Sequence, residues 1–201
     1  IPKYSEVTPA IIKELQSIVG PENVLTETHD LLSRAMVHAV FRLSRWKEHM
    51  PDVVVLPSIT SEVVEIVKLA NLCRIPLVPR AGGSGVADGA VPLKKGIVVD
   101  VKRMNKIIEI DEENMCVTVQ PGVNLDVLNS ELEKRGYILG DDPYSRPVAC
   151  IGGRIGPSGW STVAGKYGHV KDMVTGLKVV LPQGSLLKIG GLKKKRSWRK
   201  P

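Results

Sequence analysis

One stretch of this sequence organises the rest of the chain: Pro79-Arg80-Ala81-Gly82-Gly83-Ser84-Gly85-Val86-Ala87-Asp88-Gly89. It follows an apolar run, Ile75-Pro76-Leu77-Val78, which we interpret as a buried strand with a proline at its edge. Four of the eight residues 82–89 are glycines, which leave backbone N–H groups unshielded and readily adopt positive φ. Because successive N–H groups in such a turn can converge on an anionic oxygen, the stretch predicts a diphosphate cradle. A glycine-rich turn that binds nothing is the alternative, since short glycine motifs also occur without a ligand.

Two familiar phosphate-binding motifs do not fit this stretch. A P-loop requires Lys-Ser or Lys-Thr after its last glycine, and neither follows here. A dinucleotide-binding turn has the spacing G-x-G-x-x-G and opens a helix, whereas Gly83, Gly85 and Gly89 are spaced one residue too widely. Residues 90–96 also leave no room for a helix before the strand predicted over residues 97–101. A phosphate at this stretch would therefore be held by a loop without a helix dipole behind it.

A strand–helix–strand pattern precedes the glycine stretch. Val53-Val54-Val55-Leu56 is a continuous run of strand-forming residues, and the helix that follows is predicted to be capped by Thr60 or Ser61. Short connections of this kind require a parallel, right-handed βαβ crossover. The glycine stretch then leaves the carboxyl end of a parallel strand, which is where ligands bind in such sheets.

The remaining patterns predict an α+β protein with a parallel first half and an antiparallel second half. Helices are predicted over residues 8–20 and 31–49, with a short strand at 24–26. Hairpins over residues 106–120 and 176–189 flank a helix capped near Asn124. We therefore expect an N-terminal helical segment (1–50), a parallel βαβ subdomain (51–103), a larger antiparallel subdomain with flanking helices (104–191) and a basic tail (192–201).

A second glycine-rich segment, residues 142–160, separates the Asn124 helix from the final hairpin. It is long for a plain connection, and loops of that length are usually functional or disordered. The apolar residues Ile151 and Ile155 inside it favour an ordered, packed segment. Two glycine-rich loops, one in each half, predict a long ligand clamped between them.

Composition restricts the class of protein. Apolar residues make up 43% and charged residues 24% of the 201 residues, as in ordinary globular proteins. Of the net charge of +7, six positive charges lie in residues 193–201, so the body of the chain carries only +1 and no basic face for nucleic acid is expected. The basic tail touching RNA or anionic lipid is the weaker alternative. No apolar run approaches the roughly 20 residues of a membrane span.

Cysteines and histidines show no metal-binding pattern. Cys73, Cys116 and Cys150 are scattered and lack C-x-x-C spacing, which favours reduced thiols in a cytoplasmic protein. His38 and His49 have no second ligand in register, so no metal site is expected.

Several motifs follow one another in an order typical of a known family. They are Val54-Val55-Leu56-Pro57, Leu77-Val78-Pro79-Arg80, Gly82-Gly83-Ser84-Gly85, Pro121-Gly122-Val123, Asp142-Pro143, Ile151-Gly152-Gly153, Tyr167-Gly168 and Gly176-Leu177-Lys178-Val179-Val180. From about residue 51 to residue 191 the chain resembles the PCMH-type FAD-binding domain of the vanillyl-alcohol oxidase superfamily. Within it, the chain most resembles the flavoprotein subunits of D-lactate dehydrogenase and glycolate oxidase.

The resemblance implies FAD binding at both glycine segments. The first loop would contact the diphosphate through Pro79, Arg80, Ala81, Gly82, Gly83, Ser84 and Gly85. The second would approach the flavin or its ribityl chain through Pro143, Ser145, Cys150, Ile151, Gly152, Gly153, Ser158 and Gly159. Gly168 and Val174 would lie near the adenosine. Some relatives attach flavin to a His where Ser84 stands here, so the resemblance implies non-covalent FAD.

The resemblance also implies an activity: oxidation of a 2-hydroxy acid by hydride transfer to the flavin. We assign no catalytic residue, because no His, Asp or Glu stands in a constellation that requires one, and His169 is interpreted as a loop residue. The family continues past residue 201 into a substrate or cap domain, so a missing domain or a partner subunit is expected. A non-catalytic FAD- or ADP-binding module, or an orphan subunit, is the alternative. Departures from the family pattern include Ala81, where a third glycine is usual, and Arg154 and Trp160, where smaller residues are usual.

Overall fold

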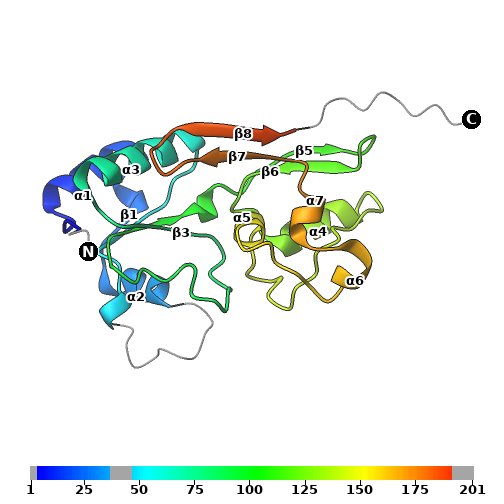
Figure 1. Cartoon of the computed structure of the whole chain (residues 1–201), viewed down its shortest axis with the longest axis horizontal. Coiled ribbons are helices and arrows are strands. Elements are labelled where there is room, and N and C mark those ends of the chain that lie inside the picture. The colour runs from blue at the N-terminus through cyan, green and yellow to red at the C-terminus, as the bar shows by residue number, and fades with distance from the viewer. Residues whose placement is uncertain (1–3, 37–46, 192–201) are drawn as a thin grey trace, which may run out of the picture.

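A four-stranded sheet forms the centre of the first half of the protein, in a computed structural model that describes residues 4–36 and 47–191 (Figure 1). Its order is β1-β2-β4-β3, comprising β1 (Val24–Leu25), β2 (Val53–Val55), β4 (Ile97–Asp100) and β3 (Leu77–Arg80). The strands β2 and β3 both run parallel to β4, and β1 pairs antiparallel with β2. The predicted parallel arrangement is confirmed. The strand β4, which comes last in sequence, lies between the other two parallel strands.

The strand before the glycine loop differs from its predicted form. β3 begins at Leu77 and includes Pro79 and Arg80, so the loop proper begins at Ala81. The predicted strand is confirmed at Leu77 and Val78, but it does not include Ile75 and Pro76. It lies at the edge of the sheet and is only partly buried, so the expectation of a buried strand is wrong. An edge position explains Pro79, because its missing N–H costs no hydrogen bond on the open side.

Helices cover both faces of this sheet. The helices α1 (Pro9–Val19) and α3 (Thr60–Cys73) pack on one face, where Leu15 and Ile66 meet Val53 and Val55. The helix α2 (Thr28–Ala35) packs on the other face, where Leu31 contacts the strand residues Val54 and Val98. Successive side chains of β2 point to opposite faces of the sheet, so this strand contributes to the hydrophobic core on each face. The N-terminal helices therefore belong to the same layered unit as the sheet (Figure 1).

Helix ends show where local patterns succeed and fail. Thr8 caps α1 and Gly20 ends it, as predicted. The cap predicted at Thr60 or Ser61 is wrong: α3 begins after Ile59, and the carboxylate of Glu62 accepts a hydrogen bond from the Ser58 N–H at 2.6 Å. The Glu62 side chain, which reaches back toward the start of the helix, therefore makes the hydrogen bond that a Thr or Ser cap was expected to make.

The helix predicted over residues 31–49 is wrong in its bounds. The helix α2 starts three residues earlier and ends at Ala35, with Met36 in an extended conformation. Residues 37–46 lie outside the described residues, and residues 47–49 form a single 3-10 turn. The predicted basic tail, residues 192–201, also lies outside the described residues.

The second half is built from two hairpins and several short helices. Both predicted hairpins are confirmed, as β5 (Ile107–Asp111) with β6 (Cys116–Val119) and β7 (Gly176–Val180) with β8 (Leu186–Gly190). The helix α4 (Leu125–Glu133) is capped by Asn124, as predicted, and packs through Leu128 and Leu132 against the first hairpin. The remaining elements are η1 (Pro21–Asn23), η3 (Val101–Arg103), α5 (Ile151–Ile155), α6 (Ala164–Tyr167) and α7 (Val170–Met173).

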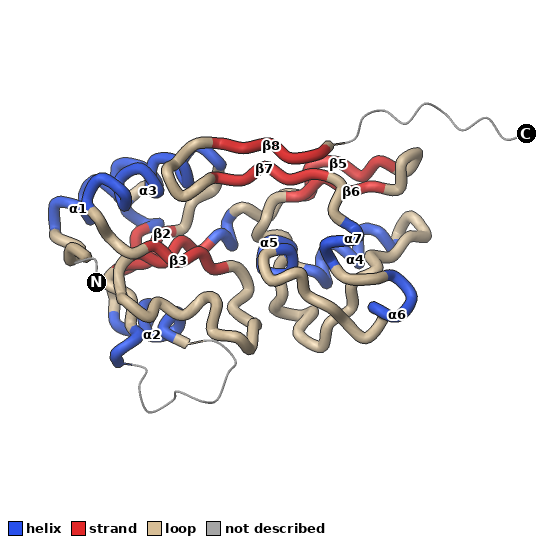
Figure 2. The backbone as a smooth tube through the Cα atoms, viewed as in Figure 1, coloured by secondary structure: helices blue, strands red, loops and turns tan. Residues whose placement is uncertain are grey.

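The final hairpin spans both halves. Figure 2 shows β7 and β8 running from the side of α3 toward β5 and β6. Its turn contacts α3, where the Asn71 side chain donates a hydrogen bond to the carbonyl of Pro182 and Gly184 lies against Lys68. Among the described residues, no helix is long and apolar enough to cross a membrane.

Candidate cofactor-binding site

The first glycine loop carries unpaired backbone donors. Within the described parts of the chain, the backbone N–H groups of residues 82–85 donate no hydrogen bond to any protein group. Gly83 adopts a φ of +68°, in the left-handed region that favours glycine. Backbone donors left free in a tight glycine bend are suited to bind an anion.

Gly82 brings this loop into contact with the second glycine-rich segment. A Cβ on Gly82 would lie 2.0 Å from the carbonyl oxygen of Val148 and 3.1 Å from the Cα of Ala149. A Cβ on Gly153 would lie 3.4 Å from the Cβ of Ala81. The two glycine-rich segments, predicted to act together, therefore meet directly, through a contact that only a residue without a side chain permits at position 82.

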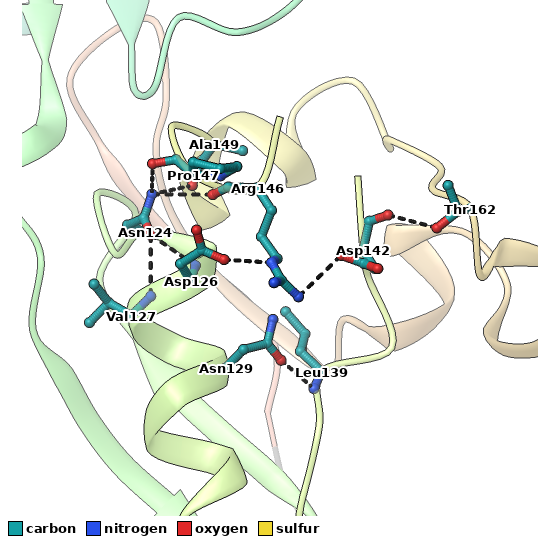
Figure 3. Close-up of polar contacts among 10 residues, drawn as sticks. All are labelled: Asn124, Asp126, Val127, Asn129, Leu139, Asp142, Arg146, Pro147, Ala149 and Thr162. Carbon is teal, nitrogen blue, oxygen red and sulfur yellow. Dashed lines mark hydrogen bonds and ion pairs between the residues drawn. The ribbon is translucent and has the colours of Figure 1, made fainter. Parts of the chain in front are cut away.

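The side chain of Asn124 holds the second segment against α4 (Figure 3). Its Nδ2 donates to the carbonyls of Pro147 at 3.0 Å and Ala149 at 3.2 Å, while its Oδ1 accepts from the N–H of Asp126 at 2.8 Å. One side chain thus caps the helix and fixes the turn that faces Gly82.

An ion-pair bridge supports the same turn. Figure 3 shows the Arg146 guanidinium between two carboxylates, Asp126 on α4 at 2.5 Å and Asp142 at 3.3 Å. These side chains are about 40–50% exposed, so solvent screens the pairs and they orient the turn more than they stabilise the fold.

Most of the predicted residues from Pro143 to Gly152 serve packing in this structure. The carbonyl of Ser145 accepts the N–H groups of Val148 and Ala149, which closes the turn after Pro143. Cys150 is 4% exposed, and burial raises the pKa of its thiol, with Lys102 acting in the opposite sense. Ile151 packs on the core of the second half, and Gly152 lies against Pro121. Their contact with flavin stays a prediction.

Arg154, a departure from the family pattern, has its own partner. Its Nε and Nη2 each donate to the Asp141 carboxylate at 2.7 Å, and Nη2 also reaches the Trp160 carbonyl at 2.9 Å. A Cβ on Gly159 would lie 2.5 Å from the Arg154 guanidinium carbon, so the predicted site residue Gly159 makes room for this pair. The Trp160 side chain is 69% exposed.

Two buried hydroxyls near Gly159 lack partners. The Oγ atoms of Ser158 and Ser161 are buried without a hydrogen bond among the described residues, and Ser158 adopts a φ of +49°. Ser158 is one of the predicted site residues, whereas Ser161 is not, because a lone serine has no spacing that indicates a binding site. Orphaned buried hydroxyls fit a site that a polar ligand completes.

Gly168 and Val174 flank the short helix α7. Gly168 ends α6 with a φ of +83°, and the Asp172 carboxylate accepts the N–H of His169. His169 is the N-cap residue of α7 and has an extended backbone, as expected for a loop residue. The N–H of Val170 donates to the carbonyl of Gly159, which ties this region to the second glycine-rich segment. The adenosine contact of Gly168 and Val174 stays a prediction.

Arg80 lies beneath the first loop. Its side chain is 8% exposed, and a Cβ on Gly83 would lie 2.3 Å from its Nη2. The fully buried Asp100 is nearby and accepts hydrogen bonds from the Arg34 Nε at 3.2 Å and the Lys102 N–H at 3.1 Å. Unpaired amides, an incompletely paired buried cation and orphaned hydroxyls together fit a ligand with an anionic centre and polar arms, such as a flavin dinucleotide.

No candidate metal centre accompanies this site in the described residues, which contain no group of three or more His, Cys, Asp or Glu able to hold an ion. His49 is buried with both ring nitrogens unpaired, but it has no acidic neighbour in such a group.

Comparison with known proteins identifies the fold and the cofactor. The family model described as "FAD binding domain" matches residues 51–190. The chain is 36% identical over 186 residues to the glycolate oxidase subunit GlcD of Bacillus subtilis (strain 168), covering 92% of this chain and 38% of that protein. It is 33% identical over 195 residues to a D-lactate dehydrogenase of Anaerostipes hadrus, covering 97% of this chain and 40% of that protein.

A solved structure agrees. An alkyldihydroxyacetonephosphate synthase superposes with a TM-score of 0.83 at 26% identity, covering 96% of this chain and 40% of that one. The chain therefore spans about two fifths of the length of the relatives it matches. The matched range contains both glycine-rich segments and both hairpins. The chain belongs to the family of PCMH-type FAD-binding domains of FAD-linked oxidoreductases, and its cofactor is FAD.

Proposed function

We propose that this chain is the FAD-binding part of an enzyme that oxidises a 2-hydroxy acid of the D-lactate or glycolate type, with FAD bound non-covalently. Two relatives at 33–36% identity, named as a glycolate oxidase subunit and a D-lactate dehydrogenase, support the substrate class. The observation that carries the cofactor's position is the set of unpaired N–H groups at residues 82–85. Ser84, in place of a histidine that could be flavinylated, supports dissociable cofactor. Three free cysteines support a reducing, cytoplasmic setting.

The chain's own residues bind and orient the cofactor. Bound FAD supplies the redox centre that takes a hydride from the substrate carbon. The amides of residues 82–85 would hold the diphosphate, and the turn at Val148 and Ala149 sets the distance between the two glycine-rich segments. The hydroxyls of Ser158 and Ser161 are available to polar atoms of the flavin side. We assign no proton acceptor for the substrate hydroxyl among the described residues.

A non-catalytic FAD- or ADP-binding module is the second candidate. Its support is that the observations on the described residues, the free amides at residues 82–85 and the contact of Gly82 with Val148, all concern the binding of a ligand. Such a module would bind the dinucleotide and leave hydroxy acids unchanged.

One preparation separates these possibilities. Protein purified without added cofactor is expected to show flavin absorbance at about 450 nm, and acid precipitation is expected to release all of the flavin. Anaerobic addition of D-lactate or glycolate is expected to bleach that absorbance, with L-lactate as the control. Absence of flavin after reconstitution with FAD would refute the proposal. Bound flavin that neither acid reduces, even with the cap domain or partner subunit present, would favour the non-catalytic module.

A further inference from the structure

The guanidinium of Arg80 is a buried cation with unsatisfied donors. Its Nη1 is buried with no hydrogen-bond partner among the described residues, and its Nη2 makes one long bond, to the Ser33 carbonyl at 3.4 Å. Burial lowers the pKa of Arg80, with attraction to Asp100 acting in the opposite sense. A buried, incompletely paired cation is costly in a folded protein, so its placement calls for a compensating partner.

The neighbouring charges leave Arg80 only partly neutralised. The Asp100 carboxylate is shared with Arg34 and the N–H of Lys102. Arg34 is in turn shared with Asp30, which lies at 3.7 Å from its Nη1 and is partly exposed. Asp100 therefore has two donors that compete with Arg80 for its negative charge.

The position of this cation matches the position of the free amides. The Arg80 guanidinium lies directly under Gly83, whose own N–H and those of its neighbours are unpaired within the described chain. A side chain at position 83 would be strained by the φ of +68°, and its Cβ would also displace the guanidinium. The free N–H groups of residues 82–85 and the positive charge of Arg80 therefore lie close together at one bend of the chain.

We propose that the side chain of Arg80, oriented by Asp100 and Arg34, is a charge-supplying residue of the diphosphate site, acting through the loop that it supports. This inference rests on FAD binding at the first glycine loop and adds a side-chain component to a site otherwise made of backbone. The ligand class is a nucleoside diphosphate moiety: FAD and ADP carry it, whereas adenosine and riboflavin do not. Loss of the Arg80 charge should therefore weaken the binding of FAD and ADP and spare adenosine and riboflavin.

The test compares ligands that differ only in the diphosphate. Binding of ADP and of adenosine to the whole flavin-free chain is measured by isothermal titration calorimetry for wild type, Arg80→Gln, Arg80→Lys and Arg135→Gln. The last variant removes the same charge from an exposed ion pair between Arg135 and Glu112 on the first hairpin, so it controls for net charge. Circular dichroism melting confirms that each variant folds.

Arg80→Gln is expected to weaken ADP about tenfold to 100-fold, from the Coulomb energy of one nearby charge at intermediate dielectric. The affinity for adenosine should change by less than about threefold, so the ratio of the ADP affinity to the adenosine affinity should fall. Arg80→Lys should restore most of the ratio, and Arg135→Gln should match wild type. The salt dependence of ADP binding should also become shallower in Arg80→Gln.

Equal losses for ADP and adenosine, or an unchanged ADP affinity in a folded Arg80→Gln protein, would overturn the inference while leaving FAD binding intact. If wild type binds FAD but neither fragment measurably, the same comparison is made with FAD and riboflavin. Failure of wild type to bind any of these ligands would remove both the inference and the proposed function. If Arg80→Gln does not fold, Arg80→Lys decides: a folded lysine variant that loses the preference for ADP refutes a role for charge.

Discussion

Substitution of Gly82 by alanine tests the contact on which the site depends. Gly82 is not among the residues with positive φ, so alanine can adopt its backbone conformation without strain. The effect of the substitution is therefore steric. It arises at the carbonyl oxygen of Val148, which is backbone and cannot rotate away.

The size of the effect follows from the distances. The new Cβ would lie 2.0 Å from the Val148 oxygen, whereas ordinary contact begins at 3.4 Å, so the two segments must separate by the difference of roughly 1.4 Å. Overpacking of this kind costs about 1–3 kcal/mol. We expect the free energy of unfolding to fall by about 2 kcal/mol and FAD affinity to fall at least about tenfold, since the loop amides move relative to the second segment.

Urea denaturation of the flavin-free chain and fluorescence titration with FAD measure the two quantities. Gly85→Ala is a matched control for stability in the same loop, because a Cβ there would meet nothing within 4 Å. Gly165→Ala is a second control, in the short helix α6, and should leave FAD affinity unchanged as well. If Gly82→Ala unfolds at the same urea concentration as Gly85→Ala and binds FAD like wild type, the contact between the glycine-rich segments is not what holds the loop.

Three further outcomes are expected. Asp100→Asn removes the buried carboxylate that Arg34 contacts and should lower the free energy of unfolding by about 3 kcal/mol in urea denaturation; a loss under about 1 kcal/mol would contradict a buried ion pair there. A double-mutant cycle of Arg154→Met with Asp141→Asn should give a coupling energy of about 2 kcal/mol, because the pair is bidentate and largely buried, and additive effects would argue against it. The thiol of Cys150 has a pKa raised above its ordinary value of 9.0, so its contribution to stability is fully present below pH 9.0 and is lost as pH rises through the folded-state pKa. Mass spectrometry at about pH 8.5 should show alkylation of Cys116 well before Cys150, and equal rates would contradict this.

Local features of the fold follow from residues that are close together in the sequence. The β-branched run at Val53, the caps at Thr8 and Asn124 and the two hairpins are of this kind, and each appears as predicted. The same locality explains the errors: apolar periodicity over residues 31–49 suggests one long helix, yet α2 ends at Ala35. Glu62 takes the role expected of Thr60 or Ser61, because a carboxylate in the first turn can also reach back to the start of the helix.

The sequence alone predicts that the glycine loop of residues 82–89 follows a parallel strand and has a backbone free of side chains. Glycine spacing and strand propensity are local properties, so neighbouring residues are sufficient for this prediction. Three arrangements depend instead on how the chain packs in space: β4 separates β2 from β3, Gly82 meets Val148, and Arg80 lies near Asp100 and the carbonyl of Ser33. Each of them joins residues far apart along the chain. Local periodicity carries no information on which distant segments pack together, since that choice is made by the shape and charge of the folded whole.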